Sequence, residues 1–142
     1  MEKKVNELGE LAQKFGAEVI SASKDEIQVR IPIAGHQQPL GVLHGGANAF
    51  LVEDAGSRLA WLYAPDGRFA VGTELSMSNL RPGTGDYATA HATPIFAGGS
   101  SFVARVEIYT DDGTHIASGR MTSVFVKIPA EYLDEYRRAV SE

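Results

Sequence analysis

The feature that most constrains this chain is the stretch from Gln38 to Leu62, in which a polar turn and two glycines precede an almost uniformly apolar segment. Placed on a helix, the residues after Gly45 and Gly46 leave almost no polar face, which predicts a helix buried inside the domain. One carboxylate, Glu53, interrupts it, and because burying a charge is costly this residue needs a specific explanation. The apolar residues of the segment are Ala47, Ala49, Phe50, Leu51, Val52, Ala55, Leu59, Ala60, Trp61 and Leu62.

The start of this helix is suited to binding a carbonyl group. Its first turn has unpaired backbone N–H groups, and the glycines let another molecule approach them closely. These groups and the helix dipole favour developing negative charge, as in an oxyanion hole. Gly45 and Glu53 are eight residues apart, about 12 Å along a helix axis, so they cannot easily reach one carbonyl from the same chain. An antiparallel second copy would bring them together, which predicts a composite site in a homodimer.

The remaining sequence predicts an antiparallel sheet. Val5, Leu8, Leu11 and Phe15 recur at helical spacing and predict an amphipathic helix over about 3–15. The segment 129–142 reads as a short terminal helix or a frayed tail. One long helix followed by consecutive strands predicts an α+β domain over 1–142, with its core at about 27–127. Strands are expected at 27–33, 69–80, 86–97, 100–111 and 114–127.

Composition excludes several classes of function. With 142 residues and 44% hydrophobic content the chain can bury one sizeable core. A net charge of −5 without a long basic run disfavours nucleic-acid binding. The absence of cysteine excludes disulfides, a thiol nucleophile and a cysteine zinc site, and the four histidines fall at no recognisable ligand spacing. No apolar run is long enough to span a bilayer and no secretory signal is seen, so a cytoplasmic protein without metal, cofactor or membrane association is expected.

GVLHGG at 41–46 followed by Glu53, with Gln38 six residues before His44, resembles the hotdog-fold acyl-CoA thioesterases of the phenylacetate type. The match is closest to the branch that uses Glu, which includes 4-hydroxybenzoyl-CoA and 1,4-dihydroxy-2-naphthoyl-CoA thioesterases. It also includes VGTELSMSNLRP at 71–82 and ATPIFAGGSS at 92–101. The resemblance implies the hotdog fold, an antiparallel sheet wrapped around a long central helix, and dimers that pair again into homotetramers.

The resemblance also implies roles for the catalytic residues. The backbone N–H of Gly45 would bind the thioester carbonyl, and Glu53 would act as general base on water or as nucleophile through a mixed anhydride. His44 would close the turn with a ring hydrogen bond, and Gln38 would contact the substrate on the carbonyl side. Ser57 lies one turn after Glu53 and could hydrogen-bond its carboxylate or the attacking water; a small residue for close helix packing is the alternative.

Further residues are expected to contact the substrate and its CoA moiety. Relatives carry a histidine near the thioester where this chain has Asn79, and often a basic residue where it has Gly99. The departure at Gly99 would weaken nucleotide binding or leave it to Arg81 or Arg105. The alternative for the segment around Gly99 is an ordinary bend between two strands. The predicted binding residues are Gly46, Asn79, Arg81, Phe96, Gly98, Gly99 and Ser100.

The resemblance predicts an enzyme that hydrolyses an aryl- or medium-chain acyl-CoA to the free acid and CoA. Glu53 could instead lie at the exposed edge of a helix that is less buried than its composition implies, or form a structural ion pair with Arg58 or Arg81. Asp54, about 100° around the helix from it, is interpreted as structural. Two alternatives use the same fold. One is a non-catalytic module that binds acyl-CoA or an aromatic ligand, and the other is an enoyl-thioester hydratase, whose histidine arrangement on the central helix is absent here.

Overall fold

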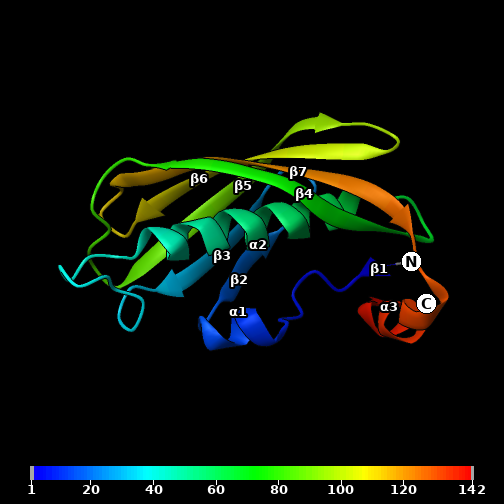
Figure 1. Cartoon of the computed structure of the whole chain (residues 1–142), viewed down its shortest axis with the longest axis horizontal. Helices are drawn as coiled ribbons and strands as arrows, with labels where there is room; N and C mark the ends of the chain where they lie inside the picture. The colour runs from blue at the N-terminus through cyan, green and yellow to red at the C-terminus, as the bar shows by residue number, and fades with distance from the viewer. Residues whose placement is uncertain (1, 142) are drawn as a thin grey trace.

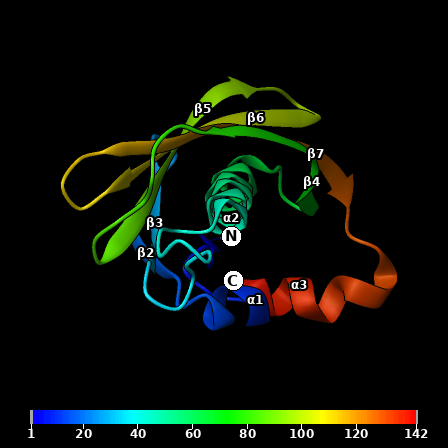
Figure 2. The same ribbon diagram turned by 60° about the vertical axis from the view of Figure 1, so that its left-hand side comes forward.

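The computed structural model describes residues 2–141, in which a six-stranded antiparallel sheet curves around one long helix (Figure 1). This helix, α2, spans Gly45–Tyr63 and is seen almost end-on, wrapped by the sheet, in Figure 2. The arrangement confirms the predicted α+β architecture. Across the sheet the strands follow the order β2 (Glu18–Ala22), β3 (Ile27–Pro32), β5 (Tyr87–Ala97), β6 (Ser101–Thr110), β7 (His115–Lys127) and β4 (Arg68–Asn79).

The core lies between α2 and the inner face of the sheet. Leu51, Val52 and Leu59 on α2 are fully buried, and strand residues such as Phe102 and Ile108 meet them from the sheet. Alternating burial along β3, β5, β6 and β7 matches the period of two in the sequence. The boundaries of these strands agree with the predicted ones to within one residue. The central helix begins at Gly45, just after His44, as expected.

The N-terminal segment is less helical than predicted. Only Glu10–Lys14 form a helix, α1, and Glu2–Lys3 form a short strand, β1. Gly9 precedes α1 with an extended backbone, and the Lys4 N–H donates to the Ala139 carbonyl at 3.1 Å. Contacts to distant parts of the chain therefore hold residues 4–7 out of the helix that their spacing predicted.

The C-terminal segment is ordered by contacts with the N-terminal one. A turn of 3-10 helix, η1 (Ala130–Tyr132), leads into α3 (Leu133–Ala139) and then β8 (Val140–Ser141), which pairs antiparallel with β1. Of the two alternatives for 129–142, the helix is correct. In Figure 2, α1 and α3 lie on the side of α2 that the sheet leaves open.

Strand β4 forms one edge of the six-stranded sheet and is the longer of its two edge strands. It pairs with β7 along its whole length of 12 residues, and its other edge has no partner among residues 2–141. Most of its residues are exposed, including Phe69 and Val71. A long exposed edge with apolar side chains invites pairing with another strand.

Candidate active site

The first turn of α2 is organised by His44. This residue caps the helix with an extended backbone, and its Nδ1 accepts the Gly46 N–H at 2.8 Å. The ring therefore closes the turn as expected and uses the N–H of Gly46. The Gly45 N–H, the first of the helix, has no acceptor among the described residues. One backbone donor at the positive end of the helix dipole is thus free to bind a carbonyl oxygen.

The loop before the helix is a compact hydrogen-bonded turn. The Gln38 N–H donates to the Val42 carbonyl at 2.9 Å, and the Gln38 Oε1 accepts the Leu40 N–H at 2.6 Å. Gly41 has a φ of +83°, a conformation in which glycine is favoured. The structure thus gives the Gln38 side chain a place within the turn. Its contact with a substrate stays a prediction.

Asn79 lies directly against Gly45. A Cβ built on Gly45 would lie 2.6 Å from the Asn79 Nδ2, so only glycine fits without displacing this amide. The Asn79 Oδ1 in turn accepts the Asn48 Nδ2 at 2.9 Å. Asn48 is 3% exposed, and its Oδ1 is buried without a partner among the described residues. Two amides, one from α2 and one from the end of β4, therefore line the helix N-terminus.

Glu53 lies two turns further along α2 on an exposed part of the helix, where it faces Gly72 near the middle of β4. The Ser57 hydroxyl donates to the Glu53 Oε1 at 3.1 Å, which is the contact expected between them. A Cβ built on Gly72 would lie 3.0 Å from the same oxygen, so the missing side chain leaves room for the carboxylate. No cation of the described residues lies within ion-pair distance of Glu53.

The neighbouring carboxylate has a structural role. Asp54 and Arg58 form a largely buried pair, with Nε to Oδ2 at 2.7 Å and Nη2 to Oδ1 at 3.1 Å. The Arg58 Nη1 also donates to the carbonyls of Val5 and Glu7. This pair ties the N-terminal segment to α2, and it excludes the alternative in which Arg58 is the ion-pair partner of Glu53.

The predicted CoA-binding residues lie at two opposite ends of the sheet. Asn79 is in register with Ala117 on β7, and Arg81, just beyond it, donates to the His115 carbonyl at 3.0 Å. The segment Phe96–Ser100 covers the end of β5 and the turn into β6, where the Gly98 N–H donates to the Ser101 carbonyl. Ser101 is in register with Val124, which pairs with Val71 near the Glu53 end. One chain therefore does not bring these two groups together.

Sequence reasoning missed two residues of this arrangement. These residues are Asn48 and Gly72, which no sequence pattern marks because only the fold places them beside Asn79 and Glu53. A cavity of about 440 Å³ opens beside Glu53 and Ser57 and extends to Trp61 and Phe69. Residues 2–141 contain no cluster of three metal-ligating side chains. No helix in the same range is long and apolar enough to cross a membrane.

Comparison with known proteins identifies the family. The sequence profile of the Thioesterase superfamily matches residues 40–117, more than half of the chain. The proofreading thioesterase EntH of Cronobacter turicensis is 31% identical over 117 residues, which cover 82% of this chain and 85% of that protein.

Solved structures agree with this match. A thioesterase from Haemophilus influenzae superposes with a TM-score of 0.79 at 30% identity, covering 82% of both chains. A Bacillus halodurans protein crystallised with CoA superposes with a TM-score of 0.76 at 30% identity, covering 84% of this chain and 78% of that one. These matches confirm the expected hotdog fold and thioester-hydrolase class, and the chain belongs to the thioesterase superfamily.

Proposed function

We propose that this protein hydrolyses an aryl- or medium-chain acyl-CoA to the free acid and CoA at a site shared by two copies of the chain. The free Gly45 N–H of one protomer binds the thioester oxygen, where negative charge develops in the transition state. Glu53 of the other protomer attacks the carbonyl carbon or takes a proton from the attacking water. This role of Glu53 is supported by the resemblance of the sequence to the branch of the family in which a glutamate is the general base or nucleophile.

One observation carries the proposal: Gly45 and Glu53 lie beside two residues of the same unpaired edge strand that are seven positions apart. Gly45 lies against Asn79, and Glu53 lies against Gly72. If β4 pairs antiparallel with its copy about a point between Leu75 and Ser76, Gly72 comes opposite Asn79 of the second chain. Glu53 of one protomer then faces Gly45 of the other.

The same pairing joins the two groups of predicted CoA-binding residues. The β5–β6 turn lies at the Gly72 end of the sheet, and Arg81 lies at the Asn79 end. An antiparallel dimer brings Arg81 of one chain toward the Phe96–Ser100 segment of the other. The CoA bound in the Bacillus halodurans relative supports CoA as the carrier of the acyl group.

Within the site, the other side chains position the two reacting groups. Ser57 holds the Glu53 carboxylate by a hydrogen bond of 3.1 Å. His44 takes the Gly46 N–H and so fixes the direction of the Gly45 N–H. Asn79 and Asn48 form a polar wall next to that donor.

The test is hydrolysis of a panel of aryl- and aliphatic acyl-CoA substrates, followed with a thiol-detecting reagent, with Glu53→Ala measured beside the wild type. We expect turnover of at least one substrate class, lost in the variant while the thermal unfolding midpoint is kept. Absence of turnover on every substrate, with tight binding retained, would instead support a non-catalytic acyl-CoA binding protein.

A further inference from the structure

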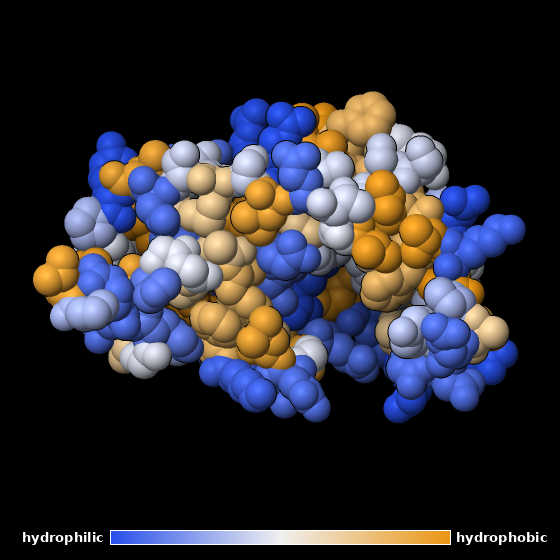
Figure 3. Space-filling model, viewed as in Figure 1, coloured by the Kyte–Doolittle hydropathy of each residue, from blue (hydrophilic) through white to orange (hydrophobic). Residues whose placement is uncertain are grey.

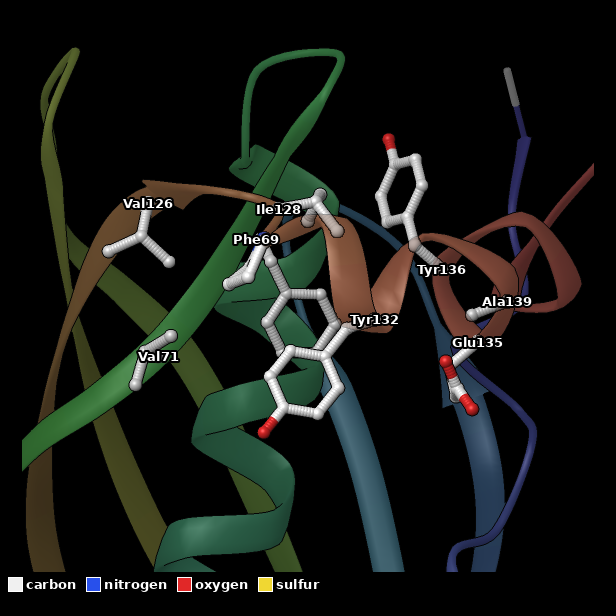
Figure 4. Close-up of a pocket in the computed structure, with 9 residues that line it drawn as sticks. Phe69, Val71, Val126, Ile128, Tyr132, Glu135, Tyr136 and Ala139 are labelled. Atoms are coloured by element: carbon white, nitrogen blue, oxygen red, sulfur yellow. The ribbon is translucent and has the colours of Figure 1, made fainter.

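A second cavity adjoins the one beside Glu53 and is almost entirely apolar. It has a volume of about 480 Å³ and lies between the β4/β7 end of the sheet and the C-terminal segment (Figure 4). Val71 and Val126 face it from the sheet, and Tyr132 and Tyr136 face it from η1 and α3. Figure 3 shows apolar surface at this end of the molecule, next to a hollow beside the C-terminal segment.

The two cavities adjoin each other, since Phe69, Val71 and Ala139 line both of them. A group that leaves Glu53 along β4 therefore reaches the side chains that border the apolar cavity. On the side formed by α3, Tyr136 is held in position by its contacts with neighbouring residues. The Tyr136 hydroxyl accepts the Gly67 N–H at 3.2 Å, and its ring packs edge-on against Trp61, whose own ring contacts Phe69 at 4.5 Å.

The lining carries no group that would pair with a charged substrate. Its one carboxylate, Glu135, is hydrogen-bonded to Arg138 at 3.3 Å, and no lysine or arginine lines the cavity. An acyl group that ends in a carboxylate would therefore lose its hydration without gaining a partner. An acyl group that ends in methylenes would gain by leaving water.

The dimensions favour a chain rather than a single ring. Gly72, beside the Glu53 carboxylate, is three residues from Phe69, about 10 Å along a strand. With C–C bonds of about 1.5 Å, an extended alkyl chain advances about 1.3 Å per carbon, so about eight carbons span this distance. At about 30 Å³ per heavy atom, the seven carbons of a benzoyl group would fill about 200 Å³, less than half of the cavity.

We propose that this apolar cavity binds the distal part of the acyl chain and makes the enzyme selective for unbranched acyl groups of at least about eight carbons. The inference rests on the proposed hydrolysis at Glu53 and names the substrate class of that site. The C-terminal segment is then the end wall of the acyl pocket, with Tyr132 and Tyr136 in contact with the chain.

The first test compares kcat/KM for the CoA thioesters of butyric to palmitic acid and for benzoyl-CoA. We expect kcat/KM to rise about twofold to fourfold per methylene between hexanoyl and decanoyl, because each methylene leaves water. A flat profile, or benzoyl-CoA as the best substrate, would overturn the inference.

The second test fills the cavity. Val126→Trp should lower the ratio of decanoyl to butyryl kcat/KM by at least about tenfold, since the added ring occupies the chain's volume. Ile20→Trp is the matched control, because Ile20 is 47% exposed on β2 at the opposite edge of the sheet, and it should keep the wild-type ratio. If Val126→Trp does not fold, Tyr132→Ala, which alters a side chain that is 56% exposed, should lower the same ratio severalfold. An unchanged ratio in the variants, or a change of oligomeric state in place of it, overturns the assignment.

A third measurement separates this inference from the proposed function. The thioether S-decyl-CoA has no carbonyl to hydrolyse, and calorimetry reports its binding without turnover. No hydrolysis of any thioester, but S-decyl-CoA binding that Val126→Trp weakens, would contradict the catalytic proposal and support the pocket. Hydrolysis with equal S-decyl-CoA affinity in wild type and Val126→Trp would contradict the pocket alone.

Discussion

Replacing Gly45 by proline removes the proposed oxyanion donor while leaving the helix able to form. Gly45 is the first residue of α2, a position where the proline ring suits the backbone and no intrahelical hydrogen bond is lost. His44 before it has φ −65° and ψ 134°, within the range that a residue preceding proline adopts. Gly45→Pro should therefore delete one N–H with little change in fold.

Gly45→Ala is the matched control, since it adds a Cβ but keeps the N–H. In both variants the new Cβ would lie 2.6 Å from the Asn79 Nδ2, so this amide must move and its hydrogen bond with Asn48 weakens. Losing that bond costs about 1 kcal/mol of stability in each. The difference in kcat between the two variants then measures the contribution of the Gly45 N–H alone.

We expect Gly45→Pro to lower kcat about 10²- to 10³-fold relative to Gly45→Ala, or about 3 to 4 kcal/mol, as for other single oxyanion donors. The assay is release of free thiol from the best acyl-CoA at saturating substrate, with thermal unfolding by circular dichroism to check the fold. A folded Gly45→Pro enzyme whose kcat stays within fivefold of Gly45→Ala would refute the role of this N–H.

Three further substitutions test other parts of the account. Glu53→Gln should lower kcat by about 10³-fold or more with an unchanged unfolding midpoint, whereas Ser57→Ala, which only loses a hydrogen bond to that carboxylate, should lower it less than about tenfold. Arg58→Met should lower the free energy of unfolding in urea by about 3 kcal/mol, because it leaves a largely buried carboxylate unpaired; a loss below 1 kcal/mol would contradict this. The hydrogen bond from the Thr110 hydroxyl lowers the pKa of Asp112 from 3.8 to about 2. Its stabilisation of the β6–β7 hairpin is therefore present above pH 3.8 and lost as the pH falls toward 2, and an NMR titration of the carboxyl carbon giving a midpoint near 4 would contradict it.

The sequence predicted the helices and strands whose own residue pattern, an apolar run or an alternation of apolar and polar residues, is sufficient to identify them. The apolar run and the two glycines placed the start of α2 correctly, and alternation placed β4 to β7. Strand β2 was missed because an edge strand that is mostly exposed on both faces shows no alternation. The short β1 and β8 were missed because only their pairing with each other, from opposite ends of the chain, makes them strands.

The contacts of the candidate site also fall into two groups, those between sequence neighbours and those between residues far apart in the chain. The contact of Ser57 with Glu53 joins residues four positions apart, and helix geometry predicts it. The contact of His44 with Gly46 is a local helix cap, and the family resemblance implied it. The approach of Asn48 to Asn79 joins residues 31 apart, so no local pattern could indicate it. Whether Gly45 and Glu53 meet depends on a second chain, which sequence spacing suggested and the unpaired edge of β4 supports.

Mixing two inactive variants tests the shared site most directly. Glu53→Ala and Gly45→Pro are unfolded together, refolded as a mixture, and compared with each variant refolded alone. If each site takes Gly45 from one chain and Glu53 from the other, every mixed dimer has one intact site, and the mixture should regain about a quarter of wild-type activity. If both residues of a site come from the same chain, no intact site forms. A refolded mixture that contains mixed dimers and stays as inactive as its components would contradict the account.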